Sequence, residues 1–190
     1  PSGVHDDGFF DIKVPVQPRE LENSVARRCL VQLPSEYDAR RRYPVIISLH
    51  SASTTPLQQI EWWAGAPSTE GRREGQAGRH GTIIVAPEWA TKTQVGYRYS
   101  AKEHSVVLSA LREVSRQFSV DTDRVYLSGH SMGGDAAWDI GLAHPDLWAG
   151  LISVSGKAGR YVHHYHQNAK RLPIYIVCRG LDHNTCSTNE

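Results

Sequence analysis

The amino-acid sequence predicts an α/β fold with a mainly parallel sheet and helices on both faces. Short β-branched runs alternate with longer helical or turn-rich stretches, an order typical of strands joined by crossover helices. Nearly every residue of the run 43–50 is apolar, which is typical of a central strand covered on both faces. The length of 190 residues indicates a single domain, 1–190, with one core.

The elements can be predicted in order along the chain. The first helix is expected to start at Pro56, because proline suits the first helical turn. Ser100 and Glu103 have the spacing of a capping box and predict the start of a second helix. A third helix, rich in small residues, is expected over 133–143. Strand and helix should alternate from residue 43 on, with strands at 25–33, 43–50, 82–86, 124–128, 148–154 and 174–178.

Composition excludes several function classes. The chain carries 21 Lys plus Arg against 20 Asp plus Glu, so its formal net charge of +1 offers no field for capturing nucleic acid. Its longest apolar stretches are far below transmembrane length, so no membrane span is expected. The 3 cysteines are too few and too dispersed for a disulfide scaffold or a zinc pair, and no metal or cofactor is expected. The localisation stays open.

The segment Gly129-His130-Ser131-Met132-Gly133 carries the chemistry. It joins a predicted strand to a predicted helix, which is the setting of a G-x-S-x-G nucleophile elbow. A serine at so sharp a turn has strained backbone, and side chains two residues to either side would collide, so glycine is required there. The helix N-terminus then faces the position where an oxyanion develops, and the Met132 N–H becomes the first oxyanion donor.

The stretch 121–134, together with 43–50 and His144-Pro145, resembles the α/β-hydrolases. The likeness runs from residue 25 to the end of the chain and is greatest to the esterase and polyhydroxybutyrate-depolymerase-like branch, with prolyl-oligopeptidase-type peptidases second. It implies a three-layer α/β-hydrolase fold and a serine hydrolase that cleaves small or polymeric carboxylic esters through an acyl-enzyme on Ser131, without a cofactor. A serine peptidase and a catalytically silent binding domain are the alternatives.

The resemblance also implies partners for Ser131. The second oxyanion donor comes from a loop that is often His-Gly in the family and is His50-Ser51 here, so the Ser51 N–H takes that role, unless Ser51 only turns the chain. The triad acid is expected at Asp182, after the predicted strand 174–178, where parallel sheets place their sites. An exposed turn aspartate is the alternative for Asp182, and Asn184 is a weaker rival for the same role.

The catalytic histidine is not identified in this sequence. The family order is serine, acid, histidine, yet few residues follow Asp182, and His183 is too close to the acid for the expected geometry. We expect the histidine, a closing strand and a closing helix to lie beyond the chain as given. The alternative is a domain that binds without cutting.

Aromatic residues around the presumed site have two interpretations. Trp62 and Trp63 follow the oxyanion loop, and Trp89 follows the strand 82–86, so that with His50 they line a substrate cleft or else pack in the core. Packing is expected for the remaining tryptophans, Trp138 and Trp148.

Other titratable residues are expected to have structural roles. His130 should pack beneath the elbow, and Asp135 and Asp139 should be solvated on the following helix. The histidines near residue 165 have no carboxylate or cysteine at ligand spacing and indicate a polar surface rather than a metal site, at His163, His164 and His166. Cys178 and Cys186 can form a disulfide in an oxidising compartment, or Cys178 can be a free core thiol.

Overall fold

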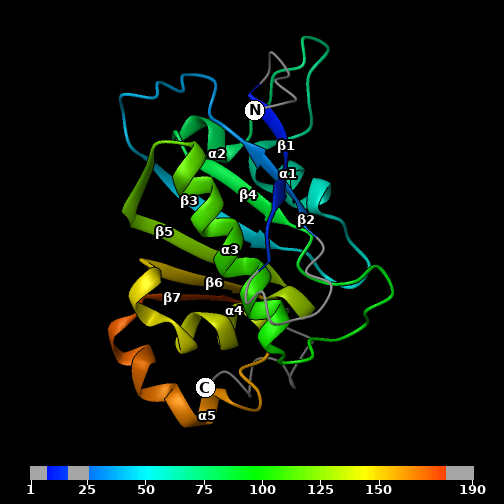
Figure 1. Cartoon of the computed structure of the whole chain (residues 1–190), viewed down its shortest axis with the longest axis vertical. Coiled ribbons are helices and arrows are strands. Elements are labelled where there is room, and N and C mark those ends of the chain that lie inside the picture. The colour runs from blue at the N-terminus through cyan, green and yellow to red at the C-terminus, as the bar shows by residue number, and fades with distance from the viewer. Residues whose placement is uncertain (1–7, 17–25, 179–190) are drawn as a thin grey trace.

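The computed structural model describes residues 8–16 and 26–178, which form one twisted sheet covered by helices (Figure 1). Neighbouring strands follow the order β1-β2-β4-β3-β5-β6-β7. The pairs β1–β2 and β2–β4 are antiparallel and every other pair is parallel, so the predicted mainly parallel α/β sheet is confirmed. The strands are β1 (Phe9–Val14), β2 (Arg27–Gln32), β3 (Tyr43–Leu49), β4 (Ile83–Pro87), β5 (Val120–His130), β6 (Gly150–Val154) and β7 (Ile174–Val177).

Helices cover both faces of the sheet. On one face α1 and α2 enclose an apolar cluster that includes Leu30, Ile60 and Ile84. On the other face α3 and α4 lie over the main core (Figure 1). Within the described ranges no helix is both long and apolar enough to span a membrane. The helices are α1 (Pro56–Ala64), α2 (Gln76–Arg79), α3 (Ala101–Gln117), α4 (Met132–Ala143) and α5 (Val162–Tyr165), with short 3-10 segments η1 (Pro145–Leu147) and η2 (His166–Arg171).

Local signals predicted most of these elements. The capping box of Ser100 and Glu103 starts α3, and α1 begins at Pro56 behind a second capping box. Strand β1 was not predicted, although its alternating burial fits a strand with one covered face. Strand β5 was predicted to start at residue 124 but starts at Val120. The strand begins earlier because Tyr43, the first residue of β3, pairs with Val120.

The sheet topology explains where a site can form. Strands β3 and β5 are parallel neighbours with Leu49 opposite Gly129, so the loops that follow them leave from the same edge. The chain leaves β3 through α1 to reach β4 on one side, and leaves β5 through α4 to reach β6 on the other. Ligands of parallel α/β sheets bind at such a divergence, outside the carboxyl ends of the strands.

Candidate active site

Ser131 lies at the turn between β5 and α4 in a backbone conformation that few side-chain-bearing residues adopt. Its φ is 52° and its ψ is -116°. Such a conformation costs about 1–3 kcal/mol and persists only where the surroundings hold it. The Ser131 N–H donates to the Val154 carbonyl of β6 at 2.8 Å, which anchors the turn to the neighbouring strand. The Ser131 hydroxyl makes no capping hydrogen bond to α4.

The glycines of the motif make this turn possible. A Cβ atom at Gly129 would lie 1.9 Å from the Gly133 carbonyl oxygen. A Cβ atom at Gly133 would lie 2.2 Å from the Leu49 carbonyl oxygen at the end of β3. Because both contacts are with backbone, no side-chain rotation can relieve them. The close approach expected of a nucleophile elbow is therefore present.

The N-terminus of α4 supplies the first candidate oxyanion donor. Met132 is the first helical residue, and an N–H in the first turn has no partner within its own helix. The positive end of the helix dipole lies at the same place and favours a developing negative charge. The Met132 side chain is buried, which holds this end of the helix in the core.

The loop after β3 lies against the start of α4. The His50 carbonyl oxygen would be 3.0 Å from a Cβ atom at Gly133, so this loop borders the elbow. The Ser51 N–H, the second expected oxyanion donor, donates to the Thr54 hydroxyl at 2.8 Å. A bound oxyanion would have to replace or share that hydrogen bond, a competition that the sequence did not predict.

His50 and Trp89 pack together beneath this loop. Of the two roles considered for Trp89, lining a substrate cleft or packing in the core, the structure shows packing. Both side chains are buried. The Trp89 indole Nε1–H donates to the His50 carbonyl at 3.2 Å, and the His50 Nδ1 lies 2.9 Å from the Ser51 carbonyl. Burial lowers the pKa of His50, which favours a neutral ring. Because a carbonyl can only accept, the contact with the Ser51 carbonyl favours the proton on Nδ1. No described residue forms a hydrogen bond with the His50 Nε2.

Trp62 and Trp63 border a cavity beside the elbow. The cavity has a volume of about 240 Å³, and the Trp62 side chain is 71% exposed at its rim. The Trp63 indole is anchored by a hydrogen bond to the Ser48 hydroxyl at 3.1 Å. The expectation that His130 packs beneath the elbow is wrong, because His130 is exposed and lines this cavity with Ser128, two residues earlier on the same face of β5.

The candidate acid lies outside the described residues. Strand β7, which precedes Asp182 in the sequence, is formed as predicted. Residues 179–190 contain Asp182, His183 and Cys186, so neither the acid nor the Cys178–Cys186 pair is placed. Among the described residues no histidine forms a hydrogen bond with Ser131.

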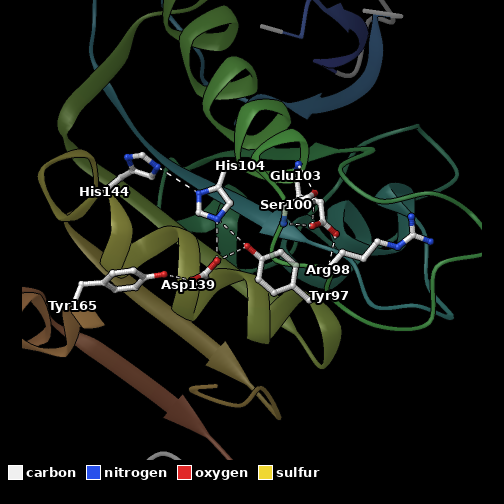
Figure 2. A network of polar contacts seen from close by, with 8 residues as sticks. All are labelled: Tyr97, Arg98, Ser100, Glu103, His104, Asp139, His144 and Tyr165. Atoms are coloured by element: carbon white, nitrogen blue, oxygen red, sulfur yellow. Dashed lines mark hydrogen bonds and ion pairs between the residues drawn. The ribbon is translucent and has the colours of Figure 1, made fainter. Parts of the chain in front are cut away.

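Asp139 of α4 is not solvated, contrary to the sequence expectation. It is 1% exposed, and its carboxylate is hydrogen-bonded by the Tyr97 hydroxyl at 2.7 Å, by the His104 Nε2 at 2.9 Å and by the Tyr165 hydroxyl (Figure 2). Burial alone would raise the pKa of Asp139, but its donors outweigh burial and lower it. The apolar residues on both sides of Asp139 were the available signal that this helix is enclosed on all sides.

The structure also places the other residues that were expected to have structural roles. Asp135 is half-buried and accepts a hydrogen bond from the Lys157 N–H at 2.7 Å, and burial raises its pKa. Trp138 and Trp148 are buried, as expected. In residues 8–16 and 26–178 no group of His, Cys, Asp or Glu side chains is arranged to hold a metal ion, and the predicted surface histidines are exposed at His163, His164 and His166.

A strained serine between a central parallel strand and a helix defines an α/β-hydrolase-fold protein. The chain belongs to the Esterase family, which it matches over residues 24–184. This match favours the esterase branch over the peptidase alternative.

Individual relatives agree with this assignment. The chain is similar to Probable feruloyl esterase C of Aspergillus terreus, with 25% identity over 150 residues, which cover 76% of this chain and 52% of that protein. The bifunctional acetylxylan esterase/xylanase XynS20E of Neocallimastix patriciarum is 29% identical over 91 residues, 48% of this chain and 12% of that protein. A solved thermostable esterase has a TM-score of 0.71 at 21% identity, covering 97% of this chain and 50% of the other. The chain thus spans about half the length of the first relative and of this structure.

Proposed function

We propose that the protein is a serine hydrolase that cleaves carboxylic esters through an acyl-enzyme on Ser131. The observation that carries the proposal is the Ser131 backbone, with φ of 52° at the N-terminus of α4. Such strain is retained at functional sites, and here it places a hydroxyl that makes no capping hydrogen bond to α4 at the edge of the sheet where parallel α/β proteins bind their ligands. Membership of the Esterase family supports the same reaction.

In the proposed mechanism the Ser131 oxygen attacks the ester carbonyl and its proton passes to a histidine outside the described residues. The Met132 N–H holds the oxyanion, joined by the Ser51 N–H once the Thr54 hydroxyl releases it. The tetrahedral intermediate expels the alcohol, which takes the proton from the histidine. Water then attacks the acyl-enzyme by the same route and regenerates Ser131. In this proposal Asp182 orients the histidine and stabilises its cation.

For the substrate we propose an ester that joins an aromatic acyl group to a saccharide. The support is the cavity of about 240 Å³ beside Gly129, bordered by Trp62 and Trp63, whose indole faces suit stacking against an aromatic or sugar ring. A feruloyl esterase and an acetylxylan esterase among the relatives point to the same class of ester.

The experiment that tests the activity is labelling of the intact gene product with a fluorophosphonate probe. We expect one adduct, on Ser131, that is absent in Ser131→Ala. An unlabelled wild-type protein would overturn the hydrolase proposal in favour of a silent binding domain. A panel of methyl ferulate, aryl acetates and proline-containing peptides then identifies the substrate class, and we expect turnover of methyl ferulate and none of the peptides.

A further inference from the structure

A continuous set of buried contacts connects Asp139 in the middle of α4 with the loop that carries Ser51. The Tyr97 hydroxyl donates to Asp139 at 2.7 Å, and the Tyr97 ring lies 5.9 Å from the ring of Trp89. The Trp89 indole in turn donates to the His50 carbonyl at 3.2 Å. The side chains of Tyr97, Trp89 and Asp139 are each less than a tenth exposed, so the contacts are shielded from water.

The last contact acts on the peptide unit that contains the second candidate oxyanion donor. The His50 carbonyl and the Ser51 N–H belong to one peptide bond, which is planar and holds these two groups in opposite directions. A hydrogen bond that fixes the direction of the His50 carbonyl therefore also fixes the direction of the Ser51 N–H. Trp89 is the described side chain that donates to this carbonyl.

Tyr97 and Trp89 belong to a long loop, residues 88–100, that joins β4 to α3. The buried Gln94 side chain ties this loop to the start of α3, with bonds to the Glu103 carboxylate at 2.5 Å and to the Gly96 carbonyl at 3.0 Å. The Arg98 N–H also donates to Glu103, at 3.3 Å (Figure 2). The loop is therefore held at its start by Trp89, in its middle by Gln94 and near its end by Tyr97.

Asp139 is the point at which this loop is joined to the helix that carries the nucleophile. Figure 2 shows Tyr97 and Tyr165 approaching Asp139 from opposite sides, with His104 of α3 between them. Burial and the negative charge of Asp139 raise the pKa of Tyr97, so its hydroxyl stays protonated and donates. This hydrogen bond therefore ties the position of the Tyr97 hydroxyl to Asp139 and so to α4.

We propose that Asp139, Tyr97 and Trp89 are positioning residues that orient the Ser51 N–H toward the oxyanion. This inference rests on the proposed function, in which Ser51 is the second oxyanion donor. It assigns the buried carboxylate a role in the reaction rather than only in joining α3 to α4. The two donors of the oxyanion hole are thereby coupled, because Met132 and Asp139 belong to the same helix.

A pair of matched variants separates positioning from stability. Tyr97→Phe and Tyr165→Phe each remove one hydroxyl that donates to Asp139, but only Tyr97 packs on Trp89. The Tyr97 hydroxyl also lies 2.9 Å from the His104 Nε2, so we expect Tyr97→Phe to lower the melting temperature somewhat more, and kcat is compared at a temperature where both variants are fully folded. Removing an oxyanion donor costs roughly a hundredfold or more in kcat, so partial misorientation should cost about tenfold. We expect kcat to fall about tenfold in Trp89→Phe, about threefold in Tyr97→Phe and less than twofold in Tyr165→Phe, while KM changes little in all three variants.

A double variant tests whether the contacts act in series. If Tyr97 acts through Trp89, the variant Tyr97→Phe/Trp89→Phe should be no slower than Trp89→Phe alone, whereas independent residues would give multiplied losses. A transition-state analogue such as an alkyl boronic acid should lose affinity in parallel with kcat. Equal kcat losses in Tyr97→Phe and Tyr165→Phe, or no loss in Trp89→Phe, would overturn the inference.

A spectroscopic measurement tests the coupling without relying on activity. The Trp89 indole ¹⁵N–¹H resonance should shift, and its hydrogen should exchange faster, in Tyr97→Phe but not in Tyr165→Phe. An unchanged resonance in Tyr97→Phe would overturn the coupling. If the wild-type protein forms no fluorophosphonate adduct, the proposed function fails, while this resonance still decides whether Tyr97 positions Trp89.

Discussion

The two sides of the candidate site are held in different ways. On the α4 side, Ser131 and Met132 owe their positions to consecutive backbone and to glycines that lie against backbone. On the β3 side, the orientation of the Ser51 peptide depends on hydrogen bonds with other side chains. The Thr54 hydroxyl accepts from the Ser51 N–H, and the Trp89 indole donates to the preceding carbonyl, that of His50. We therefore expect the first side to tolerate almost no substitution of its glycines, and the second side to respond to changes in single hydrogen bonds.

The largest effect is expected on the α4 side, from Gly133→Val. The new side chain would meet the Leu49 and His50 carbonyl oxygens, which cannot move without breaking β3 from β5. We expect a loss of stability of about 4 kcal/mol or more and no detectable activity, measured by urea unfolding and probe labelling. Gly96→Ala is the control, because a Cβ there meets no atom within 4 Å. An active Gly133→Val protein would contradict the elbow assignment.

The second-largest effect is a loss of stability on removing the Asp139 carboxylate, which lies on α4 and is connected through Tyr97 and Trp89 to the loop after β3. Asp139→Ala leaves the Tyr97 and Tyr165 hydroxyls and the His104 ring without their acceptor. We expect a loss of about 3 kcal/mol in the free energy of unfolding, because unpaired buried donors pay their full desolvation cost. The exposed Asp146→Ala should change it by less than about 0.5 kcal/mol. Similar losses in both variants would show that the network contributes little stability.

A smaller effect is expected at the Ser51 N–H itself. Thr54→Val removes the hydroxyl that accepts this N–H and leaves it free for an oxyanion. We expect kcat to rise about threefold and stability to fall by about 1 kcal/mol, the ordinary net contribution of one hydrogen bond. Thr54→Ser, which keeps the hydroxyl, should restore both values. A lower kcat in Thr54→Val would mean that Thr54 holds the loop in its productive geometry instead of competing with the substrate.

The smallest effect is a pH dependence of stability to which His50 on the β3 side contributes, alongside His144 at the end of α4, whose pKa burial also lowers. Burial lowers the pKa of His50, so the unfolded chain takes up a proton more readily than the folded protein. The stability that neutral His50 contributes is therefore complete above about pH 6.5 and is lost as the pH falls toward the folded pKa. We expect the free energy of unfolding to fall between pH 7 and pH 5, with a shallower slope in His50→Asn. His80→Asn, at an exposed histidine, is the control. If the free energy of unfolding depends on pH equally in His50→Asn and in the wild type, His50 is not the source of the pH dependence.

Sequence patterns predicted α1, α3, α4 and the parallel strands because their signals lie within a few residues, whereas the one-turn helices α2 and α5 were not predicted. The capping box at Ser100 and the proline at the start of α1 are examples. The missing polar face of α4 was a signal that the helix is enclosed. The donors that allow Asp139 to be buried could not be predicted, because Tyr97, His104 and Tyr165 lie far from it in the sequence. The exposure of His130 depends on how the end of β5 and α1 come together to form the cavity, which is a property of the assembled sheet.

The sequence by itself determined the sharp, glycine-flanked turn at Ser131. A serine on a sharp strand-to-helix turn needs glycine two residues to either side, and that steric requirement is met by consecutive residues that can be identified without a structure. Only the tertiary structure decided how the Ser51 peptide is oriented. Trp89 reaches His50 across 39 positions of the chain, and Tyr97 reaches Asp139 across 42. Hydrogen bonds of this kind depend on how loops and helices pack, and no local pattern specifies that packing.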